Sequence, residues 1–351
     1  MNPYYDVKWS SAFSHRFPVK NGVRQGAVSS PLLFSVYIDG LIKELRMSGL
    51  GCYLDNFFYG CLGYADDLLV LSGSRSGLQS MVKICEKFAA SKSLVFSTNV
   101  DPVKSKTKCI IFSKKKVAEV SPIMLNGDPL PWVLQVKHLG NILQTDNSMK
   151  LDCVSKRGKF IGKVNSFLQE FHFVAPLTFM ERLHIYGTSF YGSCLWDLYS
   201  QEVDRIYKSW NVTVRNVFDL PWSAHRYFIE SVSGCLHPKT LLSSRYTKFA
   251  GSLSSTMKTS VRYMANLARA DNRTLLGRTL GKIRDECGVD SISMMTPKDV
   301  KHKLKYVAVP QAESWRIDIL KELLDVRSNK SDITDFSRNQ IAAIISDICT
   351  S

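Results

Sequence analysis

The chain has 351 residues, of which 45% are apolar and 22% charged, a composition that suits two or three folded domains with a sizeable core. Its formal net charge of +15 favours a polyanionic partner, because each Lys or Arg placed on a phosphate releases a counterion. The sequence contains no apolar run of roughly 18 residues, no apolar signal segment near Met1 and no Cys-x-x-Cys pair among its nine cysteines. We therefore expect an intracellular protein, nuclear or cytoplasmic and not secreted, without a membrane partner, a disulfide framework or a zinc knuckle.

The first predicted elements are two helices on either side of a hairpin. Residues 31–46 predict a helix that begins at Pro31, whose missing N–H has no helical partner at that position. Two short apolar runs, residues 61–65 and 68–71, flank an acidic pair and predict a hairpin with the acids at its tip. Apolar residues at helical spacing predict a second helix over residues 78–90.

The segment that follows predicts short elements and then helices. Residues 109–112 predict a strand, residues 129–132 a turn, and residues 137–140 the start of another short strand. Beyond about residue 145 strand signals fade, and the predicted segments are apolar helical stripes over 161–171 and 203–217, helices over 239–270 and 340–349, and a polar linker over 327–335. The pattern predicts an α+β part followed by an all-helical part.

The acidic pair Asp66-Asp67 is the sharpest local signal. Two carboxylates held close together between apolar strands, where water is limited, repel each other unless a cation lies between them. Mg²⁺ is the expected cation, since it takes oxygen ligands and leaves positions for water and phosphate, and two such ions can drive phosphoryl transfer. The alternative is that two aspartates simply favour a turn.

Four motifs in one order resemble a known family. Residues 21–34 (NGVRQGAVSSPLLF) closely resemble motif B of reverse transcriptase palm domains, and residues 63–71 (GYADDLLVL) resemble motif C. Residues 104–112 are similar to the region after motif D, and residues 138–140 resemble the primer-grip turn, motif E. The resemblance is closest to the reverse transcriptases of non-LTR (LINE-type) retrotransposons and extends over about residues 5–285.

The resemblance implies an architecture and a reaction. Residues 1–145 would be a partial polymerase palm, an antiparallel sheet with helices, residues 146–235 a helical thumb, and residues 236–351 a C-terminal helical region. The complete enzyme would add deoxynucleotides from their triphosphates to the 3′-hydroxyl of a DNA primer on an RNA template, with two Mg²⁺ ions.

The resemblance also implies roles for individual residues of motifs B and C. Asp66 would be the main catalytic metal ligand and Asp67 a second acid. The residues that would bind the nucleotide or template are Arg24, Gln25, Gly26 and Tyr64. Gly26 would let the backbone approach the nucleic acid closely. Arg24 could equally be a surface charge, and Tyr64 could simply pack in the core.

The roles of several lysines and of the motif E turn have two interpretations each. Lys106 or Lys108 would contact the leaving group or a phosphate, or lie on a solvated face. His138, Leu139 and Gly140 would form the primer grip, or a buried turn at a glycine. The lysines that would follow the nucleic-acid backbone on one helix face, or lie in solvent, are Lys156, Lys159 and Lys163.

One family feature is missing from its expected place. The family takes a further aspartate from motif A, upstream of motif B, whereas the only acid before Arg24 is Asp6, in a context that looks like the strand leading into motif B. We therefore expect a truncated reverse transcriptase that lacks the fingers and does not polymerise by itself. The alternatives are a catalytically inactive RNA- or DNA-binding remnant and a protein-interaction module whose charge is incidental.

Overall fold

The computed structural model forms two compact units, Met1–Ile111 with Val117–Val133, and Phe112–Lys116 with Leu134–Ser351. The residues that it describes are 4–18, 27–99, 101–113, 120–170, 180, 190–224, 229, 233, 235–289, 295–304, 321, 324 and 342–346. The predicted boundaries near residues 145 and 235 follow the palm and thumb assignment, which remains a prediction.

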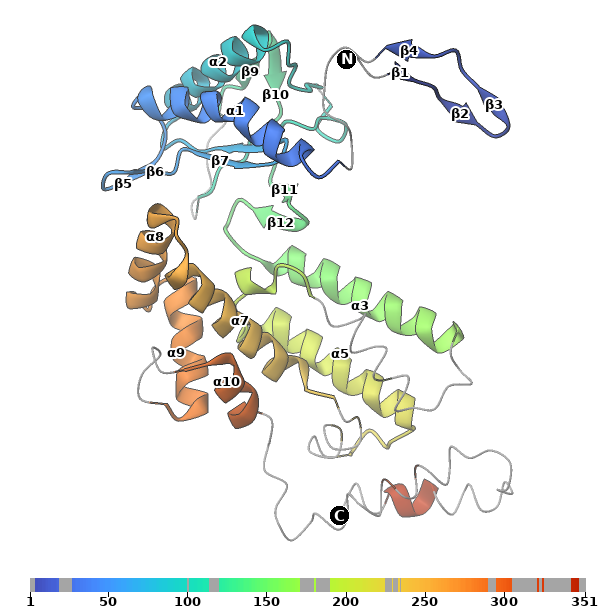
Figure 1. Ribbon diagram of the computed structural model, residues 1–351. Helices are drawn as coiled ribbons and strands as arrows, with labels where there is room; N and C mark the ends of the chain where they lie inside the picture. Colours follow the sequence, from blue (N-terminus) through green and yellow to red (C-terminus); the bar gives the residue numbers. More distant parts are fainter. Residues whose placement is uncertain are drawn as a thin grey trace. The chain divides into compact units, whose positions relative to one another are not determined.

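Two helices form the core of the first unit. Helix α1 (Ser30–Met47) packs against α2 (Arg75–Ser91), and the two lie side by side in Figure 1. The buried side chains between them and the neighbouring strand are Ile38, Leu41, Leu45, Cys61, Met81, Cys85 and Phe88. Helix α2 begins where the Ser74 hydroxyl accepts a hydrogen bond from the Gly77 N–H, a standard N-cap. The predicted helices over 31–46 and 78–90 are thus confirmed.

All strands in the described ranges form two-stranded antiparallel pairs. The pairs are β1 (Tyr4–Tyr5) with β4 (Phe17–Pro18), β2 (Lys8–Trp9) with β3 (Ala12–Phe13), β5 (Tyr53–Leu54) with β6 (Phe57–Phe58), β7 (Cys61–Tyr64) with β8 (Asp67–Val70), β9 (Ile123–Leu125) with β10 (Asp128–Leu130), and β11 (Gln135–His138) with β12 (Asn141–Gln144). The α+β class is confirmed, but these strands do not join into the single sheet expected of a palm.

Two predictions between residues 109 and 132 are wrong. Pro129 lies within strand β10, and the turn lies earlier, at Asn126-Gly127, where both residues have positive φ (53° and 86°) as a two-residue hairpin loop requires. Residues 109–112 form no strand, because only Cys109 makes a bridge, to Trp132.

The second unit is built from helices around one large core. The helices are α3 (Lys150–Glu170), α5 (Gln201–Phe218), α7 (Pro238–Ser255), α8 (Thr259–Ala270), α9 (Leu275–Cys287) and α10 (Pro297–Leu304), with a short 3-10 helix η1 (Ser193–Leu195). Helix α5 lies along α3, and α7 contacts α8, α9 and α10 (Figure 1). Phe160, Trp196, Trp210 and Tyr246 are almost fully buried in this core. No helix within the described ranges is long and apolar enough to cross a membrane.

Most of the helical predictions for this unit are confirmed. The stripe over 203–217 lies in α5, and the stripe over 161–171 lies in α3 up to Glu170. The prediction over 239–270 corresponds to α7 and α8, and residues 342–346 are helical within the prediction over 340–349, whereas the linker over 327–335 lies outside the described residues. Helices α9 and α10 were not predicted, although Thr274 is an N-cap and Pro297 begins α10.

Candidate functional site

The acidic pair lies at the tip of the β7–β8 hairpin. Tyr64 pairs with Asp67, so that Ala65 and Asp66 form a two-residue loop. Ala65 has φ of 52°, in the left-handed region that such loops use. Asp66 therefore lies in the loop and Asp67 is the first residue of β8. The predicted hairpin, with the acids at its tip, is confirmed.

The base of the same hairpin is held firmly in the first unit. Cys61, at the start of β7, is 7% exposed and belongs to the α1–α2 core, against which Leu68 and Val70 also pack. Burial raises the pKa of the Cys61 thiol to about 11. The Leu71 N–H donates to the Gly60 carbonyl oxygen at 2.8 Å and closes the open end of the pair. A buried base of this kind positions the tip without help from the tip's own side chains.

The tip itself is exposed, which corrects the expectation that water is limited around the two acids. The side chains of Asp66 and Asp67 are exposed, and Tyr64 is 67% exposed and so does not pack in the core. The physical reason is that a two-residue loop projects beyond the last cross-strand pair. Within the described ranges no three His, Cys, Asp or Glu side chains gather as a metal site. The two carboxylates have the oxygen donors that Mg²⁺ prefers, and they would supply only part of its six ligands.

The structure describes only some of the other residues predicted from motif B and from the region after motif D. Arg24, Gln25 and Gly26 lie outside the described residues. Lys106 is exposed and Lys108 is half-buried, on a segment held by the Thr107 hydroxyl, which donates to the Ser97 carbonyl oxygen at 2.8 Å. Their predicted contact with a phosphate remains a prediction.

The motif E residues form a second tight hairpin, in the other unit. His138 pairs with Asn141, and the two-residue loop between them is Leu139-Gly140, with φ of 46° and 78°. Residues 137–140 were predicted to begin a strand, whereas strand β11 ends at His138. The turn predicted at residues 138–140 is confirmed. Leucine rarely adopts a positive φ, so this conformation must be stabilised by its surroundings.

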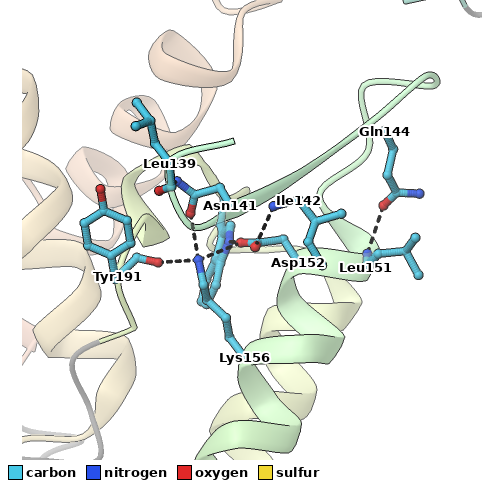
Figure 2. A network of polar contacts seen from close by, with 9 residues as sticks. Leu139, Asn141, Ile142, Gln144, Leu151, Asp152, Lys156 and Tyr191 are labelled. Atoms are coloured by element: carbon cyan, nitrogen blue, oxygen red, sulfur yellow. Dashed lines mark hydrogen bonds and ion pairs between the residues drawn. The ribbon is translucent and has the colours of Figure 1, made fainter. Parts of the chain in front are cut away.

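A buried polar network holds this second hairpin against α3, as Figure 2 shows. Lys156, 9% exposed, donates to the Asn141 side-chain oxygen at 2.7 Å and to the Asp152 carboxylate at 3.1 Å, and also to the Tyr191 carbonyl oxygen. Asp152, 1% exposed, accepts hydrogen bonds from the Trp196 indole N–H and from the backbone N–H of Ile142. The ion pair thus connects α3 to β12 and to the segment before η1.

These contacts correct the prediction for Lys156. A lysine whose ammonium group is buried and bonded to three protein oxygens cannot follow a nucleic-acid backbone. The buried residues of α3 are Asp152, Cys153, Lys156, Phe160 and Val164, so Lys156 lies on the inward face of the helix. Lys159 and Lys163 are exposed, and their predicted role is unaffected.

Sequence reasoning missed Asp152, Asn141 and Trp196. The signal that was present is the spacing of Asp152 and Lys156, four residues apart on one helix, which favours an ion pair. Burial of that pair depends on the 190–196 segment, which the helical pattern does not reveal. Gly192 in this segment has φ of 79°, and an added Cβ would lie 1.8 Å from the Asn141 side-chain oxygen. Only glycine lets the two segments approach so closely.

The family comparison covers the β7–β8 hairpin and all of the β11–β12 hairpin except its last residue, Gln144. Residues 2–143 match the family described as reverse transcriptase (RNA-dependent DNA polymerase). A stretch of 74 residues is 35% identical to the "Retrovirus-related Pol polyprotein from type-2 retrotransposable element R2DM" of Drosophila melanogaster. That match covers 21% of this chain and 7% of the relative.

Proposed function

We propose that this chain supplies part of the active site of an RNA-directed DNA polymerase of the non-LTR retrotransposon type, because residues 2–143 match the reverse transcriptase family and a stretch of 74 residues is similar to a retrotransposon polyprotein. The observation that carries the proposal is the Asp66-Asp67 pair, exposed at the tip of a hairpin whose base is buried. Two exposed carboxylates on a buried base can bind cations without rearrangement of the core, and a bound cation can in turn attract a phosphate.

In the proposed reaction, Asp66 and Asp67 serve as metal ligands. The oxygen of a primer 3′-hydroxyl forms a bond to the α-phosphorus of a deoxynucleoside triphosphate, and the bond to pyrophosphate breaks. Asp66 would be the main ligand of Mg²⁺ and Asp67 a second one, and the chemistry that the ion would supply there is activation of the hydroxyl and stabilisation of the charge on the leaving oxygen. The polypeptide positions the reactants and provides no nucleophile.

We also propose that these 351 residues do not polymerise by themselves. The family uses a further aspartate from motif A, and the acid that precedes motif B here is Asp6. Its carboxylate lies 3.9 Å from the guanidinium group of Arg16, on the β1–β4 ribbon. A second segment that carries the motif A aspartate is therefore part of the proposal, as is an intracellular setting.

A primer-extension assay tests the catalytic proposal. The full chain, fused to an upstream segment with a motif A aspartate, is supplied with an RNA template, a DNA primer, deoxynucleotides and Mg²⁺. Asp66→Asn should lower extension by on the order of 10³-fold, because a metal ligand is lost, and leave primer–template binding unchanged.

Asp55→Asn is the matched control. Asp55 is an exposed acid in the two-residue loop of the β5–β6 hairpin, so the change removes the same charge from a comparable hairpin tip. Equal activity of Asp66→Asn and Asp55→Asn would contradict the assignment of Asp66.

Nucleic-acid binding without catalysis is the second candidate function. The net charge of +15 and the exposed Lys159 and Lys163 favour it. Under this function, Asp66→Asn leaves both primer extension and binding to an RNA–DNA hybrid unchanged. The double variant Lys159→Met with Lys163→Met weakens binding to the hybrid and reduces the dependence of that binding on salt.

A further inference from the structure

We propose that Asp152 and Lys156 are positioning residues: their buried ion pair fixes the conformation of the Leu139-Gly140 turn, and through it the place of the primer end, without contact with nucleic acid. The part of this inference that concerns the primer rests on the proposed function, which makes the turn a primer contact. The part that concerns the turn rests on the contacts alone.

Lys156 is fully engaged by the protein. Its ammonium group has three N–H donors, and three oxygens lie within hydrogen-bond distance of Nζ, those of Asn141 (2.7 Å), Asp152 (3.1 Å) and the Tyr191 carbonyl. Its side chain is 10% exposed. Because all three N–H donors of Lys156 are used within the protein, this lysine can influence a ligand only through the residues that it contacts.

Asp152 joins three segments at one carboxylate. One oxygen accepts from the Trp196 indole N–H at 2.8 Å and from Lys156, and the other accepts from the backbone N–H of Ile142 in β12 at 3.0 Å. The strand that leaves the turn is therefore attached to α3 by a charge-assisted hydrogen bond, which is stronger than a neutral one.

Asn141 connects the ion pair to the turn itself. Its side-chain oxygen accepts from Lys156, and its side-chain nitrogen donates to the Leu139 carbonyl oxygen at 3.3 Å (Figure 2). Leu139 is the residue with the unfavourable φ of 46°. Such a conformation persists only where the surroundings determine it, and the Lys156–Asn141–Leu139 chain of contacts provides that constraint.

A separate contact at the far end of the hairpin offers an internal comparison. The Gln144 side-chain oxygen accepts from the backbone N–H of Leu151 at 2.9 Å, which also attaches β12 to α3 but does not reach the turn. Loss of this contact should loosen the far end of the hairpin and leave Leu139-Gly140 as it is.

Amide hydrogen exchange of the full chain tests the positioning role. Lys156→Met and Asn141→Ala should each speed exchange in residues 138–142 by about tenfold or more, with no change in α5, because the turn loses its constraint while the core remains. Asn141→Ala leaves the ion pair in place, so it decides the question even if Lys156→Met fails to fold. The control variants, Lys159→Met on the exposed face of α3 and Gln144→Ala, should leave exchange at the turn unchanged.

Binding measurements separate positioning from general support. The probes are a DNA primer annealed to an RNA template, with a recessed 3′ end, and the same RNA single-stranded. Asn141→Ala should weaken binding of the hybrid by about tenfold and leave binding of the single-stranded RNA unchanged. Unchanged exchange at the turn, equal loosening of α5, or equal hybrid affinity of Asn141→Ala and wild type would overturn the inference.

The two proposals fail in different ways. A wild-type chain that does not distinguish the hybrid from RNA alone contradicts the primer contact, and with it the proposed function at this turn. The exchange experiment in that case still decides whether the ion pair fixes Leu139-Gly140.

Discussion

The two tight hairpins of this protein share a design and differ in what surrounds their tips. β7–β8 and β11–β12 are both pairs of four-residue strands joined by a two-residue loop, and both loops contain a residue other than glycine with positive φ. At the first tip Asp66 and Asp67 are exposed, whereas beside the second an Asp–Lys pair is buried and every donor of Lys156 is used.

The difference indicates how charge is used in each unit. Exposed carboxylates that have no buried counter-ion remain able to bind metal cations, so they suit a catalytic role. A buried ion pair has lost that ability and gained geometric control, because each partner is costly to remove. Four predictions test this contrast, from the largest expected effect to the smallest.

The largest effect is expected from Asp152→Ala. It leaves the Lys156 ammonium buried without its counter-ion and the Trp196 indole N–H without an acceptor. The free energy of unfolding of the second unit should fall by about 3–5 kcal/mol, measured by urea denaturation with tryptophan fluorescence. Asp204→Ala on α5 is the matched control, since Asp204 pairs with Lys208 at the same spacing but on the surface, and should cost about 0.5 kcal/mol or less. Equal losses would remove the contrast.

The base of the first hairpin should make stability sensitive to alkaline pH. Burial raises the pKa of the Cys61 thiol from 9.0 to about 11. Because the folded-state pKa is the higher one, this stabilisation is complete below pH 9 and is lost as the pH rises toward 11, at about 1.4 kcal/mol per pH unit. Urea denaturation at about pH 8 and pH 10 measures the loss. Cys61→Ala should remove only the share of this thiol, because burial also raises the pKa of the Cys85 and Cys109 thiols in the same unit. If the free energy of unfolding of Cys61→Ala fell with pH as steeply as that of the wild type, the Cys61 thiol would not have a raised pKa in the folded protein.

The loop conformations predict opposite responses to glycine and alanine. Gly140→Ala should cost about 1–2 kcal/mol, because φ is 78° and the new Cβ would lie 3.3 Å from the Tyr191 ring. Ala65→Gly should stabilise the first hairpin by up to about 1 kcal/mol, since glycine accepts φ of 52° without strain. Thermal unfolding measures both changes; a stabilising Gly140→Ala would contradict the described turn.

The smallest effect on stability is expected from Asp66→Asn. An exposed side chain at a hairpin tip contributes little to folding, so the free energy of unfolding should change by no more than about 0.5 kcal/mol. The same urea titration used for Asp152→Ala provides the measurement. A loss of several kcal/mol would mean that Asp66 supports the fold, and the contrast between the two hairpins would disappear.

Local signals predicted most of the helices and the acidic hairpin tip, the family resemblance indicated the turn at Leu139-Gly140, and long-range packing decided much of the rest. Pro31 and the apolar spacing of residues 78–90 are short-range features that fix α1 and α2. The burial of Lys156 depends on Tyr191 and Trp196, 35 and 40 residues away, which no periodicity on α3 reveals. The exposure of Asp66 could not be predicted either, because an apolar strand on each side is compatible with a covered or an open tip.

Gly192 shows how a residue without a side chain can limit which descendants of this gene remain functional. A Cβ atom added at Gly192 would lie 1.8 Å from the Asn141 side-chain oxygen, so even the substitution by alanine displaces Asn141. A mutation that changes no charge would thereby release the Leu139-Gly140 turn. Under the proposed function, copies that carry such a change would keep both aspartates of the acidic tip and lose the turn that we propose as the primer contact.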